Sequence, residues 1–414
     1  MNGFSGKLSP QAWMVAPETQ KVMAALLEDG GDARFVGGCV RDALVNRKVI
    51  DVDIATPLKP EEVIERLTRH KIAYAPTGLK HGTVTAIADG HPFEITTLRL
   101  DVATFGRHAE VAFTDDWKAD AARRDFTINA IFSTAEGDIY DPFGGVADLR
   151  LGRVRFVGDA EKRIHEDILR ILRFFRFYAH FGKGEADAAA LKACAAAAAQ
   201  IPKLSAERIR QEVLKLLDSD HCPAVWKLMS QCGIVAHFLP EAVRVEALEN
   251  LVRLENEHHS QSFALRRLAA VLDVTDSGGA RIAEKLRLSN DQAAQLSQMT
   301  GPDAALPLDM DDAAVRKFVY RLGNDMTRNL LLLAAAKTGD QGKLEQLYQT
   351  ATEFRAPRFP LQGEDLLNLG YAPGPEIGLV LETIEEWWIG RDFAPGRAEC
   401  LQKLNAGFKP KPYS

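Results

Sequence analysis

Two aspartates in a D-x-D pattern stand out in FVGGCVRDALVNRKVIDVDIAT, residues 35–56. Asp51 and Asp53 alternate with Val52 and Ile54, and residues i and i+2 of a strand point to the same face. Burying a carboxylate is costly unless its charge is compensated. Mg²⁺ prefers carboxylate oxygens together with substrate phosphates, so the pair indicates metal-assisted phosphoryl transfer. A solvent-facing edge strand with two unrelated aspartates is the alternative for D-x-D alone.

A pair of glycines upstream suggests a second part of the same site. Gly37 and Gly38 lie between an apolar run and a helical segment. Glycine lets the backbone approach a ligand closely, and exposed N–H groups at such a junction bind phosphate. Arg41 follows one turn into the helix, within reach of a phosphate oxygen. The sequence contains neither G-x-G-x-x-G nor G-x-x-x-x-G-K-[ST], which disfavours Rossmann and P-loop sites, and an ordinary turn is the alternative for a lone Gly-Gly.

The elements that must position these residues alternate between strand and helix up to about residue 150. We expect strands at 33–38 and 49–56, a hairpin over 83–99 turning at Asp89-Gly90, and helices at 18–31, 39–45 and 60–70. Beyond Gly152 the strand signals thin out, and 159–181 and 205–217 are expected as helices. Breaks between domains are expected near Gly152, Pro240 and Pro357.

Composition limits the classes of protein to consider. The 414 residues carry a formal net charge of -6, so no global basic field points to nucleic acid, although local patches can still bind RNA. The five cysteines are scattered without C-x-x-C, which is typical of free thiols in a reducing compartment. The N-terminus shows no signal-peptide pattern, and the apolar run 330–336 is too short to cross a membrane. We therefore expect a cytoplasmic protein without a membrane segment.

Further motifs, in order and at matching spacing, carry a family resemblance over residues 34–217. They are VGGCVRD, DVDIAT, PTGLKHGTVTAI, PFEITTLRLD, RRDFTINAIF, DPFGGVADL, RIHEDILRILRFFRF and LSAERIRQE. The chain resembles the class II tRNA nucleotidyltransferases, or CCA-adding enzymes, and the related bacterial poly(A) polymerases. The resemblance implies an α/β polymerase-β-like nucleotidyltransferase head at 1–150, followed by an all-helical neck at 151–240, body at 241–355 and tRNA-binding tail at 356–414.

The resemblance also implies roles for individual residues in the head. Asp51 and Asp53 would be catalytic and bind two Mg²⁺ ions, and Glu94, by pattern only, would be a third metal ligand. The triphosphate and nucleotide would be bound by Gly37, Gly38, Arg41, Arg123, Arg124 and Asn129. Asp125 would organise this segment or touch the sugar.

A carboxylate and an arginine in EDILRILRFFR would read the base. Asp167 and Arg170 match those positions, and the chemistry agrees, because cytosine and adenine each present an amino donor beside a ring-nitrogen acceptor. Uracil and guanine present the reverse order and would leave groups unpaired. Arg173 continues the series. Arg176 would fall nearly opposite Asp167 on a continuous helix and meet phosphate or pair with an acid.

The predicted function is template-independent addition of C, C and A to the tRNA 3′ end from CTP and ATP, with release of pyrophosphate. The alternatives are a poly(A) polymerase, a CC-only or A-only enzyme, and a non-catalytic RNA-binding protein. A full-length loop with Gly106, Arg107 and His108 favours completion of the terminal A. The partner would be tRNA; no protein partner is implied, and a homodimer is left open. The RNA contacts expected in the helical half are Arg266, Arg267, Arg281, Lys285, Arg287, Lys403, Lys409 and Lys411.

Overall fold

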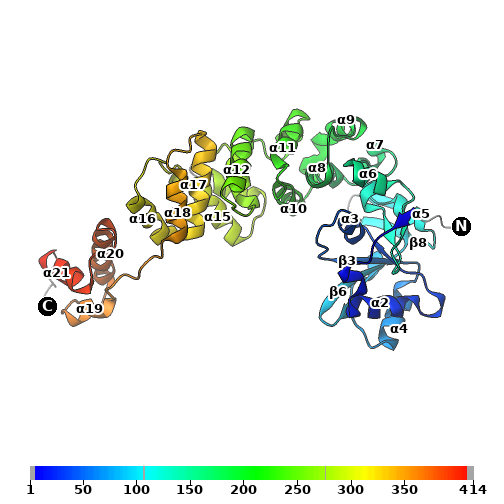
Figure 1. The fold of residues 1–414 in the computed structure, drawn as a ribbon, viewed down its shortest axis with the longest axis horizontal. Helices are drawn as coiled ribbons and strands as arrows, with labels where there is room; N and C mark the ends of the chain where they lie inside the picture. The colour runs from blue at the N-terminus through cyan, green and yellow to red at the C-terminus, as the bar shows by residue number, and fades with distance from the viewer. Residues whose placement is uncertain (1–4, 106–107, 276, 408–414) are drawn as a thin grey trace. The chain divides into compact units, whose positions relative to one another are not determined.

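The computed structural model describes residues 5–105, 108–275 and 277–407 (Figure 1). The chain divides into two compact units, Met1–Pro240 and Glu241–Ser414. The division falls at Pro240, one of the expected breaks. The finer division into head, neck, body and tail stays a prediction.

All strands in the described part of the chain lie before residue 141, as expected for an α/β head. Eight of them form one sheet in the order β1-β10-β9-β2-β3-β6-β5-β4. Their bounds are Gly6–Lys7 (β1), Arg34–Val36 (β2), Val52–Thr56 (β3), Ala73–Gly78 (β4), Thr83–Ala88 (β5), His91–Thr97 (β6), Phe132–Ser133 (β9) and Asp138–Tyr140 (β10). β7 (Arg99–Phe105) and β8 (His108–Phe113) form a separate antiparallel pair. β3 and β6 are the parallel pair in the large sheet, and the other neighbours are antiparallel.

The predicted hairpin is confirmed as β5 and β6. Ala88 pairs with His91, and the two residues between them, Asp89 and Gly90, have φ of 49° and 82°. Positive φ at both central positions is the type I′ turn that Asp-Gly favours, because its twist matches that of the flanking strands. The hairpin therefore brings β6 alongside β3.

Alternation along the central strands builds two apolar layers. Phe35 and Ile54 belong to a core completed by α2 (Pro17–Leu27) and α4 (Pro60–Arg69), which contact each other and β5 (Figure 1). Their neighbours Val36 and Ala55 face the opposite layer, where they meet Trp117 of α5 (Trp117–Ala122). Asp53 alternates with Ile54 and so lies on the α5 side of the sheet.

The remaining helices of the first unit are short or follow the sheet. They are α1 (Ala12–Val15), α3 (Gly38–Leu44), α6 (Gly145–Leu151), α7 (Ala160–Glu166), α8 (Leu169–Phe181), α9 (Ala188–Ala197), α10 (Ala206–Leu217) and α11 (Cys222–Gln231). α8 packs against α10 (Figure 1), and Phe174 and Phe175 are completely buried, as expected for core residues.

The expectation of one continuous helix over 159–181 is wrong. Asp167 stands between α7 and α8 with extended backbone angles, φ −152° and ψ 108°. Its side-chain oxygen accepts a hydrogen bond from the N–H of Leu169, 3.1 Å away. Aspartate competes for nearby backbone N–H groups in this way, which starts the second helix afresh. The angular placement of Arg176 relative to Asp167 on one helix is therefore also wrong.

The second unit is all-helical in its described residues. Its helices are α12 (Val245–Glu257), α13 (Ala264–Val271), α14 (Gly278–Lys285), α15 (Asn290–Thr300), α16 (Asp312–Leu322), α17 (Asn324–Thr338), α18 (Leu344–Glu353), α19 (Gly363–Asn368), α20 (Pro375–Gly390) and α21 (Arg397–Gly407). The apolar run 330–336 is the buried centre of α17, which packs against α12, α13 and α18. Among the residues described, no helix is long and apolar enough to cross a membrane.

Candidate active site

The three predicted carboxylates gather where β3 and β6 run side by side. Asp53 of β3 is the register partner of Glu94 of β6. Asp51 lies just outside β3, which begins at Val52 rather than at residue 49, and it is exposed. Only Arg34 and Phe35 of β2 pair with β3, opposite Ala55 and Ile54, so the first residues of the expected strand have no partner on that side. The strand therefore places Asp53 and Glu94, while Asp51 belongs to the preceding loop.

Burial and crowding of negative charge raise the pKa of Asp53. Burial, followed by the charges of Glu94 and Asp51, raises its pKa to about 6, against the opposing charges of Arg124 and Arg41. A bound cation would relieve this repulsion, so the donor chemistry fits a divalent metal. Within the described ranges, no three acidic, histidine or cysteine side chains already converge on one point as metal ligands. The carboxylates suit a metal in kind, but the structure does not show them assembled around one.

The predicted glycines lie at the junction of β2 and α3. Gly37 has φ 70°, a conformation that a residue with a side chain adopts at a cost, and α3 begins at Gly38. A Cβ added to Gly37 would meet the Arg124 guanidinium at 3.5 Å. Arg41 of α3 donates to the Asn129 side-chain oxygen over 2.6 Å and pairs with Asp42. The glycine turn, Arg41, Arg124 and Asn129 therefore lie together, as the prediction requires.

The two neighbouring arginines of RRDFTIN share one buried partner. Arg123 and Arg124 both pair with Asp120 of α5, at 2.7 and 3.1 Å, and the Asp120 side chain is only 1% exposed. Arg124 lies beside Gly37 and its charge lowers the pKa of Asp53, so the Arg124 guanidinium reaches toward the carboxylates. The backbone oxygen of Arg123 instead accepts a hydrogen bond from Arg163.

Asp125 organises the next part of the site. Its carboxylate accepts hydrogen bonds from the Asn129 amide at 3.0 Å and from Arg173 of α8 at 2.7 Å. Burial alone would raise its pKa, but the charge of Arg173 and the hydrogen bonds from Asn129, Arg173 and Phe126 N–H hold the pKa at about 2. Asp125 is therefore a half-buried, ionised link between Asn129 and α8.

The predicted base-reading pair is split between two other partners. Asp167 accepts from Arg208 of α10 at 2.7 Å, and Arg170 donates to Glu166 at 2.5 Å. Among the described residues no side-chain contact joins Asp167 to Arg170, although the Arg170 N–H donates to the Asp167 backbone oxygen at 3.0 Å. Both side chains are partly exposed, 23% and 13%, so each is held in place while keeping a face toward solvent.

The other two arginines of α8 meet a single acid. Arg173 and Arg176 both contact Glu212 of α10, whose side chain is 8% exposed. Pairing of Arg176 with an acid was one of its two expected outcomes. Arg173 thus bridges Asp125 and Glu212, and Arg176 continues the chain of contacts into α10.

Sequence reasoning missed the residues that hold the site together. Arg208 and Glu212 both lie in LSAERIRQE, a motif quoted for the resemblance but given no individual roles. Their spacing of four residues on α10 puts them on one helix face, toward α8. Asp120, which pairs with both arginines of the RRD motif, precedes Arg124 by the same spacing. The i, i+4 charge pattern is the signal that could have identified all three.

Two of the expected RNA contacts are buried instead. Arg266 and Arg267 of α13 are 3% and 1% exposed, and both pair with buried Glu255 of α12 at 2.7 Å. They stabilise the interior, because a buried carboxylate needs compensating charge, and they offer no free surface to RNA. Lys285 pairs with exposed Glu241 at 3.3 Å. Gly106, Arg107, Lys409 and Lys411 lie outside the described residues, and the side chain of His108 is not described.

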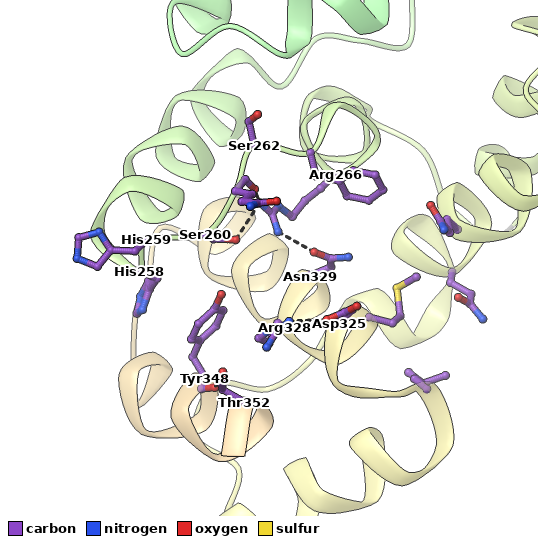
Figure 2. Close-up of a pocket in the computed structure, with 16 residues that line it drawn as sticks. His258, His259, Ser260, Ser262, Arg266, Asp325, Arg328, Asn329, Tyr348 and Thr352 are labelled. Atoms are coloured by element: carbon purple, nitrogen blue, oxygen red, sulfur yellow. Dashed lines mark hydrogen bonds and ion pairs between the residues drawn. The ribbon is translucent and has the colours of Figure 1, made fainter. Parts of the chain in front are cut away.

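A cavity of about 820 Å³ lies in the second unit, lined by the segment that follows α12 and by residues of α13, α15, α17 and α18 (Figure 2). Arg266 forms part of its lining and donates to Asn329 at 2.7 Å and to Ser260 at 3.2 Å. Figure 2 shows Tyr348 and His258 along one side, with their rings 4.8 Å apart. No metal or base-reading residue predicted from the sequence lines this cavity, so its volume alone does not mark the active site.

Comparison with known proteins identifies relatives of this chain. A family model described as the poly A polymerase head domain matches residues 33–155, and one described as a probable RNA and SrmB-binding site of polymerase A matches 187–245. The mitochondrial CCA tRNA nucleotidyltransferase 1 of Mus musculus is 34% identical over 97% of this chain and 93% of its own. A CCA-adding enzyme of Streptococcus pyogenes serotype M4 is 31% identical over 92% of this chain and 96% of its own.

A solved structure extends the likeness to the fold. The crystal structure of the Bacillus stearothermophilus CCA-adding enzyme in complex with CTP superimposes with a TM-score of 0.73 at 27% identity, covering 95% of this chain and 99% of that one. The polymerase-β-like head followed by helical domains is therefore confirmed as the fold. By sequence and by fold, this chain belongs to the family of CCA-adding enzymes and is a nucleotidyltransferase.

Proposed function

We propose that this enzyme adds C, C and A to the 3′ end of tRNA, using CTP and ATP. The observation that carries the proposal is the carboxylate cluster of Asp53 and Glu94 beside Arg124 and the glycine turn at Gly37. Relatives named as CCA-adding enzymes match nearly the whole chain, which supports the same reaction here.

The chemistry is transfer of a nucleotidyl group. The 3′ oxygen of the RNA forms a bond to the α-phosphorus, the bond from that phosphorus to the α,β-bridging oxygen breaks, and pyrophosphate leaves. Asp51, Asp53 and Glu94 would hold two Mg²⁺ ions, which when bound polarise the α-phosphate and favour the ionised 3′ hydroxyl. Arg41 and Arg124 would neutralise the triphosphate, with Gly37 and Gly38 leaving room for it. Asn129 would hold Arg41 in position through the bond seen here.

Selection of the base would depend on Asp167 and Arg170. Each has an intramolecular partner in this structure, Arg208 and Glu166. To read a base, Asp167 must accept from its amino group, and Arg170 must donate to its ring nitrogen. Pairing with cytosine or adenine would replace part of these existing contacts.

The test is incorporation by the purified full-length chain on a tRNA transcript that lacks its 3′ CCA. CTP, ATP, UTP and GTP are supplied singly and together with Mg²⁺, and products are sized at nucleotide resolution. Growth by C, C and A that then halts is expected. Asp53→Asn should reduce the rate at least about a thousandfold, because the charge that holds the metals is lost. Asp89→Asn, a matched change at the hairpin turn, should leave the rate unchanged.

Other products would assign a different activity to the enzyme. Long tails of A alone would identify a poly(A) polymerase, and arrest after CC would identify a partial enzyme. Incorporation that persists in Asp53→Asn would remove the assigned role of this carboxylate. Tight binding of tRNA without any incorporation would mark a non-catalytic RNA-binding protein.

A further inference from the structure

A small cavity with an unusual charge lies between the end of α3, α8 and α10. Its volume is about 230 Å³, and Phe181 forms part of its wall. The cationic side chains that line it are Arg41, Arg47, Lys48, Arg176 and Lys215. The acidic ones are Asp42 and Asp218. Five cations against two acids is a local reversal of the chain's net charge of -6.

The arginines of this cavity are fixed in place by other groups. Arg41 pairs with Asp42, and its guanidinium lies 4.5 Å from the Phe181 ring centroid. Arg47 donates to the backbone oxygen of His180 at 2.6 Å and lies over the same ring at 4.4 Å. Arg176 pairs with Glu212. Their orientations are therefore set before any ligand binds.

The two lysines differ from these arginines. Lys48 and Lys215 are exposed, and none of the described residues forms a hydrogen bond or an ion pair with either side-chain ammonium group. The pKa of His180 shows that the electrostatic potential here is positive. Burial lowers this pKa, and the charges of Arg47 and Arg176 lower it further. The charge of Asp218 and the hydrogen bond to the Lys215 carbonyl raise it. An anion is the missing partner of such a cavity.

We propose that this cavity binds a phosphate group of the RNA strand whose 3′ end is extended, with Lys48 and Lys215 as its free contacts. The inference rests on the proposed function and adds a substrate contact to it. Arg41 belongs both to this cavity and to the predicted triphosphate site, so the cavity adjoins the reaction centre. A strand that delivers its 3′ oxygen to Asp53 carries further phosphates close behind, and the open, lysine-edged cavity suits a polymer.

The test is binding of a tRNA transcript lacking CCA, measured without nucleotide between about 50 and 200 mM salt. The double variant Lys48→Ala/Lys215→Ala should weaken tRNA binding about tenfold and reduce the salt dependence by roughly one ion per lost contact. Affinity for CTP should stay unchanged. Lys48→Arg/Lys215→Arg should retain tRNA binding, because phosphate is recognised here by charge, and Lys21→Ala, an exposed lysine of α2, is the matched control.

The outcomes separate this inference from the function on which it rests. Unchanged tRNA affinity in the double variant would overturn the phosphate site even if CCA addition is confirmed. A loss of CTP affinity instead of tRNA affinity would assign the cavity to nucleotide phosphates and would also overturn it. Weaker tRNA binding by the double variant, together with a wild-type chain that adds no nucleotide, would refute the proposed function and still support an RNA phosphate site in this cavity.

Discussion

At the scale of single residues, the site is one continuous polar network. Asn129 accepts from Arg41 through its side-chain oxygen and donates to Asp125 through its amide. The asparagine amide carries an acceptor oxygen and a donor NH₂ group side by side, so it can connect a cation to a carboxylate. From Asp125 the contacts continue through Arg173 to Glu212. A change at any of these positions is therefore expected to act on its neighbours too.

Acid unfolding tests the part played by Asp125. Its folded pKa of about 2 lies below the ordinary value of 3.8, so its carboxylate contributes stability that is present above about pH 4. That contribution, about 2 kcal/mol, is lost as the pH falls toward 2. Asp125→Asn should therefore be less stable than the wild type near pH 6, and the difference should shrink below pH 4.

Urea unfolding from pH 7 downward measures this difference. Asp89→Asn is the control, because asparagine tolerates the positive φ of 49° at this turn and no buried partner is lost. The control should unfold in parallel with the wild type. A stability gap for Asp125→Asn that stays constant down to pH 2 would show that the ionised carboxylate is not what stabilises the fold.

At the scale of elements, sequence patterns predicted which segments form but not how they meet. The glycine turn after β2, the Asp89-Gly90 hairpin and the helical neck follow from local signals. Pairing of Asp53 with Glu94 depends on β3 and β6 running parallel, which joins residues about 40 apart and leaves no local trace. The break at Asp167 was missed because both α7 and α8 have helical patterns and the capping bond competes with a continuous helix.

The arginines of α13 also show that sequence patterns do not predict how elements meet. Two adjacent arginines on a helix suggested an RNA-facing surface, but Glu255 of α12 pairs with both inside the second unit. Residues 11 and 12 apart in the sequence give no sign that they share a buried partner. Arg266 and Arg267 are buried because of how α13 packs against α12, which helix periodicity alone does not predict.

The coupling between α8 and α10 can be tested at Glu212. Glu212→Gln leaves Arg173 and Arg176 without the charge they share, and removing one member of a buried ion-paired group costs about 3 kcal/mol. The free energy of unfolding of the full chain should fall by that amount in urea. Glu161→Gln on the exposed face of α7 is the matched control and should change it by less than about 0.5 kcal/mol.

Combining Glu212→Gln with Arg176→Gln, and measuring each change alone, completes a double-mutant cycle. If the pair stabilises the helices, the double variant should be less destabilised than the sum of the single changes. Additive losses would show that Glu212 and Arg176 act independently and that their contact contributes nothing of its own.

At the scale of the whole molecule, tRNA binding must overcome an acidic total charge, so the cations that bind RNA have to be grouped. The predicted tail, residues 356–414, has its own apolar cluster, which includes Leu366, Ile384 and Trp388. Pairs between α16 and α20 or the residues just after it, Arg316–Asp392 and Arg321–Glu386, connect the tail to the rest of the second unit. The cluster also packs against Tyr320 of α16, whose ring lies 5.7 Å from that of Trp388, but it contains no residue of α17, so it can be removed without opening the core around α17.

Removing residues 356–414 tests whether the tail holds tRNA. The remaining chain should fold, because α12, α13 and α18 still cover α17, while its affinity for tRNA should fall at least about tenfold as contacts outside the active site are lost. Affinity for CTP should not change, because none of its predicted ligands lies in the second unit. A short acceptor-stem RNA is the control substrate: it lacks the rest of the tRNA that the tail would bind, so it should be extended equally well by both chains. Full tRNA affinity in the shortened chain would show that RNA is recognised outside the tail, by the neck and body. The lysine-edged cavity would then contribute a larger share of the tRNA affinity.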